Sequence, residues 1–218
     1  MPGHGTKVEG HGPGVVLSCP LDMDQRGAKA FILKKLRYDL PEGRTYHSLE
    51  HTLDVLAAVI DIAAQEGVTD QELELLKTAA LYHDAGFTVQ DEDHEVVSCG
   101  LARESLPAFG YAPEQVERIC SMIMATKIPQ SPGDDKLARI LCDADLDYLG
   151  RPDFFRIGDE LFAEMKRFGR LSTEREWNEL QVSFLQGHTY FTATNIRDRQ
   201  PAKLEHLAAV QRWLKEHP

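Results

Sequence analysis

Four side chains in the sequence have the chemistry of metal ligands and fall on or beside apolar helical stripes: His51, His83, Asp84 and Asp145. Burying a polar or charged group is costly unless it is paired or bound to metal. Two imidazoles and two carboxylates suit a borderline divalent ion, namely Mn, Fe, Co, Ni or Zn. Three or four protein ligands also leave coordination positions for water, as catalytic sites require.

Helical periodicity selects these residues. His51 continues an aliphatic stripe in the segment TYHSLEHTLDVL, and His83 ends a similar stripe in LYHDAGF. His47 lies one turn before His51, nearer the start of its predicted helix. Gly86 is expected to end the helix that carries His83 and Asp84. A lone histidine on such a stripe is more often a hydrogen-bonded core residue, so it is the joint occurrence that favours a metal site.

The acidic segment CDADLDY offers three carboxylates, and spacing distinguishes among them. Asp145 continues the apolar side of the predicted helix, whereas Asp143 and Asp147 share a side with basic residues. We therefore expect Asp145 to point inward and the other two to lie on the polar side. The alternative interpretation is that the whole acidic segment is a solvated face.

The elements that position these residues are predicted to be helices throughout, because no alternation long enough for a strand occurs. N-cap residues are expected at Thr69, Asp134 and Thr173, the last within a capping box that includes Glu176. We predict an all-α, single-domain helical bundle over residues 21–218, preceded by a flexible Gly-rich segment over 1–20. The predicted helices cover 22–39, 46–66, 70–84, 91–108, 113–126, 134–148, 153–169, 174–187 and 201–216.

Composition narrows the classes of function. The 218-residue chain has a formal net charge of −11, which argues against general nucleic-acid binding. No apolar run is long enough for a membrane span, and the N-terminus does not resemble a signal peptide, so a cytoplasmic protein without membrane association is expected. The four cysteines form no C-x-x-C pair and are expected to be buried free thiols. His4 and His11 are interpreted as part of a disordered start rather than as metal ligands.

Three segments together resemble a known family. YHSLEHT, LYHDAGF and LCDADLDYLG, in this order between Tyr46 and Gly150, look like the H…HD…D pattern of the HD superfamily of metal-dependent phosphohydrolases. The resemblance implies a helical bundle and assigns His51, His83, Asp84 and Asp145 as metal ligands. It implies a metal-dependent phosphoric ester hydrolase.

The first segment also resembles the YHN-x-x-H element of cyclic-nucleotide phosphodiesterases. That resemblance implies that His51 binds metal and that His47 lies beside the scissile phosphate as a general acid, a task suited to histidine because its usual pKa is near neutrality. Ser48 departs from the Asn of that element. The departure weakens the assignment of cyclic nucleotides specifically.

Further site residues are expected around this core. His94, the one histidine between the His-Asp pair and Asp145, is a candidate for binding substrate or a second ion, such as Mg or Mn, bridged by Asp84. Its alternative role is packing at the start of its helix. Phosphate also needs cationic partners, for which Lys127 is a catalytic candidate and Arg197 a substrate-binding candidate.

The expected function is hydrolysis of a small-molecule phosphate ester, with a nucleotide as the first choice, by phosphatase or phosphodiesterase chemistry. Asp84 or Asp145 would orient or deprotonate the attacking water. Two alternatives stay open: a non-catalytic nucleotide-sensing or interaction module, and a di-iron oxygenase on an HD-type bundle. A homodimer is the expectation from the general frequency of symmetric dimers.

Overall fold

Side-chain caps start six of the ten α-helices in the described part of the chain. Ser48 accepts a hydrogen bond from the His51 backbone N–H, and Thr69 and Thr173 form capping boxes with Glu72 and Glu176. These hydroxyl and carboxylate groups satisfy backbone N–H groups that have no partner inside a helix. The predicted caps at Thr69 and Thr173 are confirmed.

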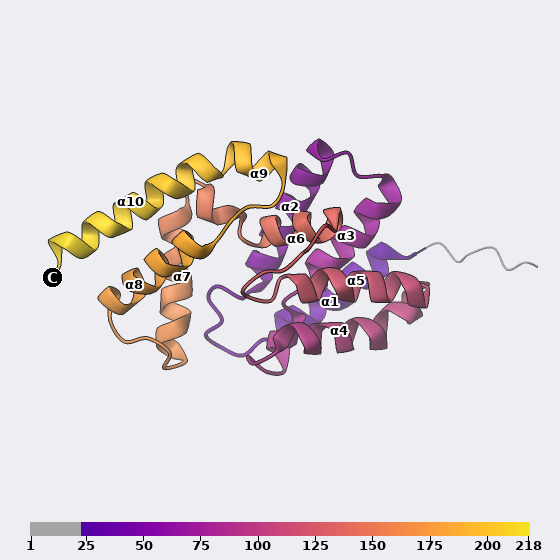
Figure 1. Ribbon diagram of the computed structural model, residues 1–218. Helices are drawn as coiled ribbons and strands as arrows, with labels where there is room; N and C mark the ends of the chain where they lie inside the picture. Colours follow the sequence, from indigo (N-terminus) through magenta and orange to yellow (C-terminus); the bar gives the residue numbers. More distant parts are fainter. Residues whose placement is uncertain (1–22) are drawn as a thin grey trace, which may run out of the picture.

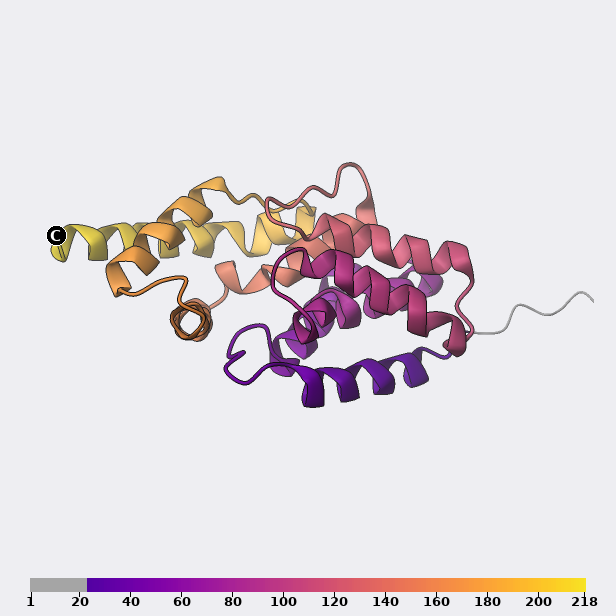
Figure 2. The same ribbon diagram turned by 90° about the horizontal axis from the view of Figure 1, so that it is seen from below.

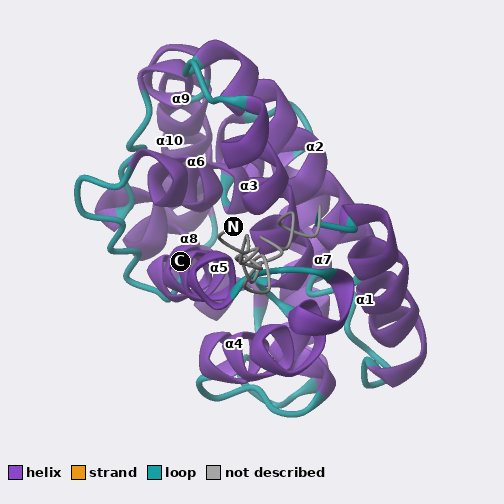
Figure 3. Cartoon of the chain, turned by 90° about the vertical axis from the view of Figure 1, so that its right-hand side faces the viewer, coloured by secondary structure: helices purple, strands orange, loops and turns teal. Residues whose placement is uncertain are grey.

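The structure, a computed structural model, describes residues 23–218. The predicted flexible start, with His4, His11 and Cys19, lies outside the described residues. Ten α-helices occur in the described part of the chain, which contains no strand (Figure 3). They are α1 (Gln25–Asp39), α2 (Leu49–Gln65), α3 (Asp70–Tyr82), α4 (His94–Ser105), α5 (Pro113–Ala125), α6 (Lys136–Asp145), α7 (Phe154–Arg167), α8 (Glu174–Gly187), α9 (Ala193–Asp198) and α10 (Gln200–Glu216), with 3-10 helices η1 (Ala85–Thr88), η2 (Leu106–Phe109) and η3 (Asp147–Gly150).

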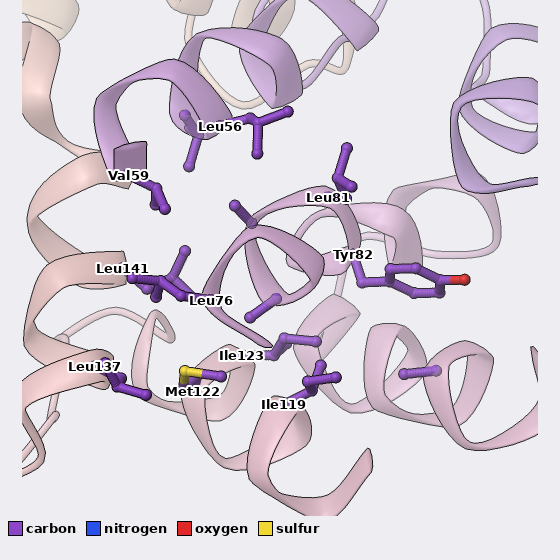
Figure 4. Close-up of a cluster of buried hydrophobic side chains, with 14 of the residues drawn as sticks. Leu56, Val59, Leu76, Leu81, Tyr82, Ile119, Met122, Ile123, Leu137 and Leu141 are labelled. Carbon is purple, nitrogen blue, oxygen red and sulfur yellow. The ribbon is translucent and has the colours of Figure 1, made fainter. Parts of the chain in front are cut away.

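The helices form two groups that meet at α6. Helices α1–α6 gather on one side of the molecule, and α7–α10 extend from them on the other (Figures 1 and 2). The larger hydrophobic cluster belongs to the first group, where aliphatic side chains of α2, α3, α5 and α6 meet (Figure 4). A second cluster joins Tyr46 and Tyr148 to side chains of α7, α8 and α10. The all-α prediction is confirmed.

All nine predicted helices are present, with ends within three residues of the predicted ones. The predicted N-cap at Asp134 is wrong by one residue, because it is the Asp135 carboxylate that accepts from the N–H groups of Leu137 and Ala138. Helix α9 was not predicted. It is only six residues long, and Thr192 caps its start.

The expected role of Gly86 as a helix end is also wrong. Helix α3 ends at Tyr82, and Gly86 lies within η1 without a positive φ. A Cβ at Gly86 would lie 1.9 Å from the backbone oxygen of His94. Glycine is therefore needed here so that η1 and the start of α4 can pack closely.

Three cysteines lie in the described residues: Cys99, Cys120 and Cys142. All are buried and unpaired there, as predicted. None of the helices in residues 23–218 is both long and apolar enough to span a membrane.

Candidate metal and hydrolytic site

Three helices bring the four predicted ligands to one point. His51 lies in the first turn of α2, His83 and Asp84 directly follow α3, and Asp145 is the last residue of α6. His51 Nε2 lies 3.3 Å from Asp145 Oδ1 and 3.5 Å from Asp84 Oδ2. His83 Nε2 lies 3.4 Å and 3.3 Å from the same two oxygens. The possible ligand atoms of His51, His83 and Asp145 lie within 4.8 Å of one another.

These donors fit a divalent transition-metal ion. His83 Nδ1 lies 2.8 Å from the backbone oxygen of Ala80, to which it would donate, and this leaves the Nε2 lone pair directed at the cluster. His83 Nε2 and Asp84 Oδ2 are buried and have no hydrogen-bond partner among the described residues. Buried polar atoms of this kind normally have a partner. A cation between the four side chains would satisfy both atoms at once.

The electrostatics of the cluster favour ionised carboxylates. Burial alone would raise the pKa of Asp84, but the charge of His83 and close contacts with His83 and His94 hold it well below its usual range. Burial likewise opposes ionisation of Asp145, whereas the hydrogen bond from His51 and the close contact with His83 bring its pKa to about 2. Burial lowers the pKa of His83, yet the two carboxylates raise it well above its usual value. The site is therefore built to concentrate positive charge between two carboxylates.

Helix α4 holds the His83–Asp84 turn in place through Ser98. The buried Ser98 hydroxyl donates to the His83 carbonyl oxygen at 2.7 Å and accepts from the Gly86 N–H at 2.8 Å. A backbone turn that carries two ligands is thus fixed by one side chain of a neighbouring helix. Nothing in the sequence pattern pointed to Ser98.

His47 lies beside the cluster, just before α2, and is held by Glu164 of α7. Its Nδ1 is 2.6 Å from Glu164 Oε1, and its backbone N–H donates to Glu164 Oε2 at 3.0 Å. The same carboxylate accepts from the Tyr46 N–H and from Arg44 Nη1. With Nδ1 engaged by Glu164, Nε2 is the nitrogen that can exchange a proton with a bound molecule. Glu164 is a site residue that the sequence analysis missed.

His94, the first residue of α4, lies on the other side of Asp84. Its Nε2 is 3.4 Å from Asp84 Oδ1 and 3.5 Å from Glu95 Oε1. Its ring stacks on Phe87, with centroids 3.9 Å apart. His94 therefore packs at the start of its helix and also approaches the cluster. Glu95 is buried beside it, a position that its place in the first helical turn did not indicate.

The two predicted cationic residues lie farther out. Lys127 is exposed and forms an ion pair with Asp93, in the wall of a charged cavity next to His47 and His94. Arg197 lies on α9, where it bonds Asp198 and Gln65. Arg197 does not line the cavity at the metal cluster. The structure thus brings His47 and His94 to the ligands, places Lys127 at the rim and leaves Arg197 outside.

The neighbours of Asp145 correct another expectation. Asp143 and Asp147 are buried rather than on a polar face. Asp143 accepts from the Phe191 and Thr192 N–H groups and the Thr192 hydroxyl, whereas Asp147 accepts from Asn195 and Arg199. Both carboxylates bind the segment that leads into α9 and α10. The chain from 191 to 199 is therefore a structural cover for the back of α6 and η3.

Comparison with known proteins agrees with this arrangement. The HD domain family model matches residues 48–147. The structure is similar to the crystal structure of a predicted HD superfamily hydrolase from an uncultured Thermotogales bacterium, with a TM-score of 0.56. The two sequences are 23% identical, and the match covers 87% of this chain and 92% of that chain, so the likeness concerns the fold. No curated protein matches the chain. Residues 48–147 therefore form an HD domain, which confirms the resemblance of the chain to the HD superfamily.

Proposed function

We propose that the protein is a metal-dependent phosphohydrolase that cleaves a phosphate ester of a small molecule. The observation that carries the proposal is the convergence of His51, His83, Asp84 and Asp145 on one point beside a cavity that His47 also lines. A divalent ion held there would supply Lewis-acid chemistry, polarising a phosphoryl oxygen and acidifying a water molecule.

The residues have distinct roles in the proposed reaction. Asp84 or Asp145 orients the attacking water and accepts its proton. The water oxygen forms a bond to phosphorus, and the bond from phosphorus to the leaving oxygen breaks. His47 gives a proton to that leaving oxygen. Glu164 fixes the ring of His47 through its 2.6 Å contact with Nδ1, so that the proton is delivered from Nε2.

A second ion, to which Asp84 would also contribute a ligand, is part of this proposal. The two oxygens of Asp84 face different partners: Oδ2 faces His51 and His83, whereas Oδ1 faces His94. Glu95 Oε1 lies near His94 Nε2 and adds a further oxygen donor. Hard ions such as Mg or Mn prefer oxygen ligands and retain water, which suits this more open side. A nucleotide substrate, phosphodiesterase-like activity, a homodimer and a cytoplasmic location stay predictions.

The test is hydrolysis by protein freed of metal and then loaded with Mn, Co, Ni, Mg or Zn. The substrates are p-nitrophenyl phosphate and bis(p-nitrophenyl) phosphate, which separate phosphatase from phosphodiesterase activity. We expect His51→Ala to lose both metal and turnover. His47→Ala should keep the metal and lose turnover of an ester with a poor leaving group, such as ethyl phosphate, by roughly 10²- to 10⁴-fold, the usual share of a general acid. His217→Ala, which changes an exposed histidine far along the chain, is the matched control.

Absence of hydrolysis with every metal would contradict the proposal and favour a non-catalytic sensing module. Two irons per chain together with oxygen-dependent turnover would instead favour the oxygenase alternative. If His51→Ala left metal content unchanged, the assignment of the metal ligands would be wrong.

A further inference from the structure

The cavity at the metal cluster extends into an apolar space between the two groups of helices. Its volume is about 370 Å³, within the range of small-molecule sites. At one end it is lined by His47, Asp84 and Asp145. The other end is formed by aliphatic and aromatic side chains of α7 and α8, including Leu161, Met165, Trp177, Leu180, Phe184 and Leu185. If the phosphoryl group of a bound molecule reaches the cluster, the organic group attached to that phosphate would therefore lie among apolar side chains.

Few polar groups line the apolar end. Gln181 lies among these side chains, and its amide already donates to Asn178 Oδ1. Arg170, also in the lining, forms an ion pair with Asp91. A nucleobase or a sugar would lose hydrogen bonds to water on entering this space. Such a loss weakens binding unless the protein supplies hydrogen bonds in their place. An alkyl or aryl group would lose none.

The charged cavity next to the cluster does not favour additional phosphates. Its three cationic residues are Arg44, Lys127 and Arg170, and each is paired with a carboxylate. The carboxylates that line it outnumber these cations: Asp91, Glu92, Asp93, Glu95 and Glu164. Among the described residues of this wall, no cation without a carboxylate partner is present for a second or third phosphate.

We propose that the substrate is a phosphate monoester with one phosphoryl group and an apolar alkyl or aryl leaving group, which lies between α7 and α8. This inference rests on the proposed phosphohydrolase function, and it puts apolar esters ahead of nucleotides. The leaving alcohol departs from the apolar end with the proton supplied by His47, and inorganic phosphate is the second product.

The test compares ethyl, butyl and hexyl phosphate, whose leaving alcohols have nearly equal acidity. The Mn-loaded protein is used. Its hydrolysis of adenosine 5′-monophosphate and adenosine 5′-triphosphate is measured separately, because these two compounds represent nucleotide substrates. Each methylene buried in the apolar end should raise kcat/KM about threefold, so on the order of a hundredfold separates ethyl from hexyl phosphate. Adenosine 5′-triphosphate should be the poorest substrate.

A matched pair of variants locates the effect. Leu180, 39% exposed, lines the cavity, whereas Leu204, 52% exposed, lies on α10 outside it. Leu180→Gln should reduce the hexyl-to-ethyl ratio of kcat/KM by about threefold or more. Leu204→Gln should leave that ratio unchanged. Equal ratios in the wild type and in Leu180→Gln would overturn the location of the leaving group.

Binding of ethylphosphonate and hexylphosphonate, whose C–P bond is not hydrolysed, separates the two proposals. Turnover that does not rise with chain length, or that is faster with adenosine 5′-monophosphate than with hexyl phosphate, overturns the apolar substrate and leaves the hydrolase. Tighter calorimetric binding of hexylphosphonate without turnover of any ester overturns the hydrolase and supports the apolar ligand. Equal binding of the two phosphonates without turnover overturns both.

Discussion

Replacing Glu164 with Gln should destabilise the protein in a pH-dependent way. The carboxylate is 3% exposed and accepts hydrogen bonds from Arg44, from His47 and from the Tyr46 backbone. Burial opposes its ionisation, but these donors lower the pKa of Glu164 from 4.5 to about 2. At about 1.4 kcal/mol per pKa unit, the ionised form contributes about 3 kcal/mol to folding at neutral pH.

The lowered pKa of Glu164 determines how its contribution to stability depends on pH. The contribution is fully present above the unfolded value of 4.5 and is lost as the pH falls through about 2. Wild type and Glu164→Gln should therefore differ by about 3 kcal/mol at pH 7 and by about half as much at pH 3. Urea denaturation of the metal-free protein, followed by circular dichroism across this range, measures the difference.

Glu160→Gln is the control, because Glu160 lies one turn earlier on α7 and pairs with Arg156 at the surface. Surface ion pairs contribute roughly 0.2–1 kcal/mol, so this variant should remain near wild type at every pH. The reasoning would be refuted if the difference in unfolding free energy between wild type and Glu164→Gln stayed constant from pH 7 to pH 3. It would also be refuted if Glu164→Gln destabilised the protein no more than Glu160→Gln does.

Three further predictions concern the metal cluster. Gly86→Ala should lower stability by about 1–3 kcal/mol and lose metal, because its Cβ would meet the His94 backbone oxygen; thermal unfolding and metal analysis test this. Gln130 donates to Asp145 Oδ2 and to the Cys142 carbonyl oxygen, so Gln130→Met should weaken metal affinity about tenfold with the fold retained, as measured by competition with a chelator. Adding Mn at a hundred times its Kd to the metal-free protein should stabilise it by about 2.7 kcal/mol, whereas an unchanged Tm would contradict a metal site.

Much of the fold and of the ligand set could be predicted because both depend on short-range patterns. Apolar spacing within one helix identified His51 and Asp145 as inward residues, and the His83–Asp84 pair at a helix end was visible in the same way. Cap residues such as Thr69 and Thr173 act over three positions of the chain. The structure brings these ligands together because α2, α3 and α6 pack against one another through the apolar stripes that made them recognisable.

Contacts between distant parts of the chain could not be predicted in this way. Glu164 acts on His47, which lies 117 positions away, and on its own helix it has the appearance of an ordinary surface carboxylate. Asp143 occupies a polar position of α6 by spacing, yet the segment at Thr192 covers it and supplies the hydrogen bonds that its burial requires. Arg197 belongs to this covering segment and lies outside the cavity. Periodicity describes one helix at a time, so it does not reveal which later segment will lie against its polar side.

Ser48 shows how the structure changes the interpretation of a motif. In the sequence, Ser at this position separates the chain from the YHN-x-x-H element and so bears on the substrate. In the structure, the Ser48 hydroxyl accepts from the His51 N–H at 3.3 Å and caps α2. Ser and Asn are both strong N-cap residues, so their exchange preserves the start of the helix and the position of His51. The departure from Asn therefore carries little information about substrate. In the proposed reaction, the choice of leaving group would depend instead on the apolar side chains that α7 and α8 contribute to the cavity lined by His47.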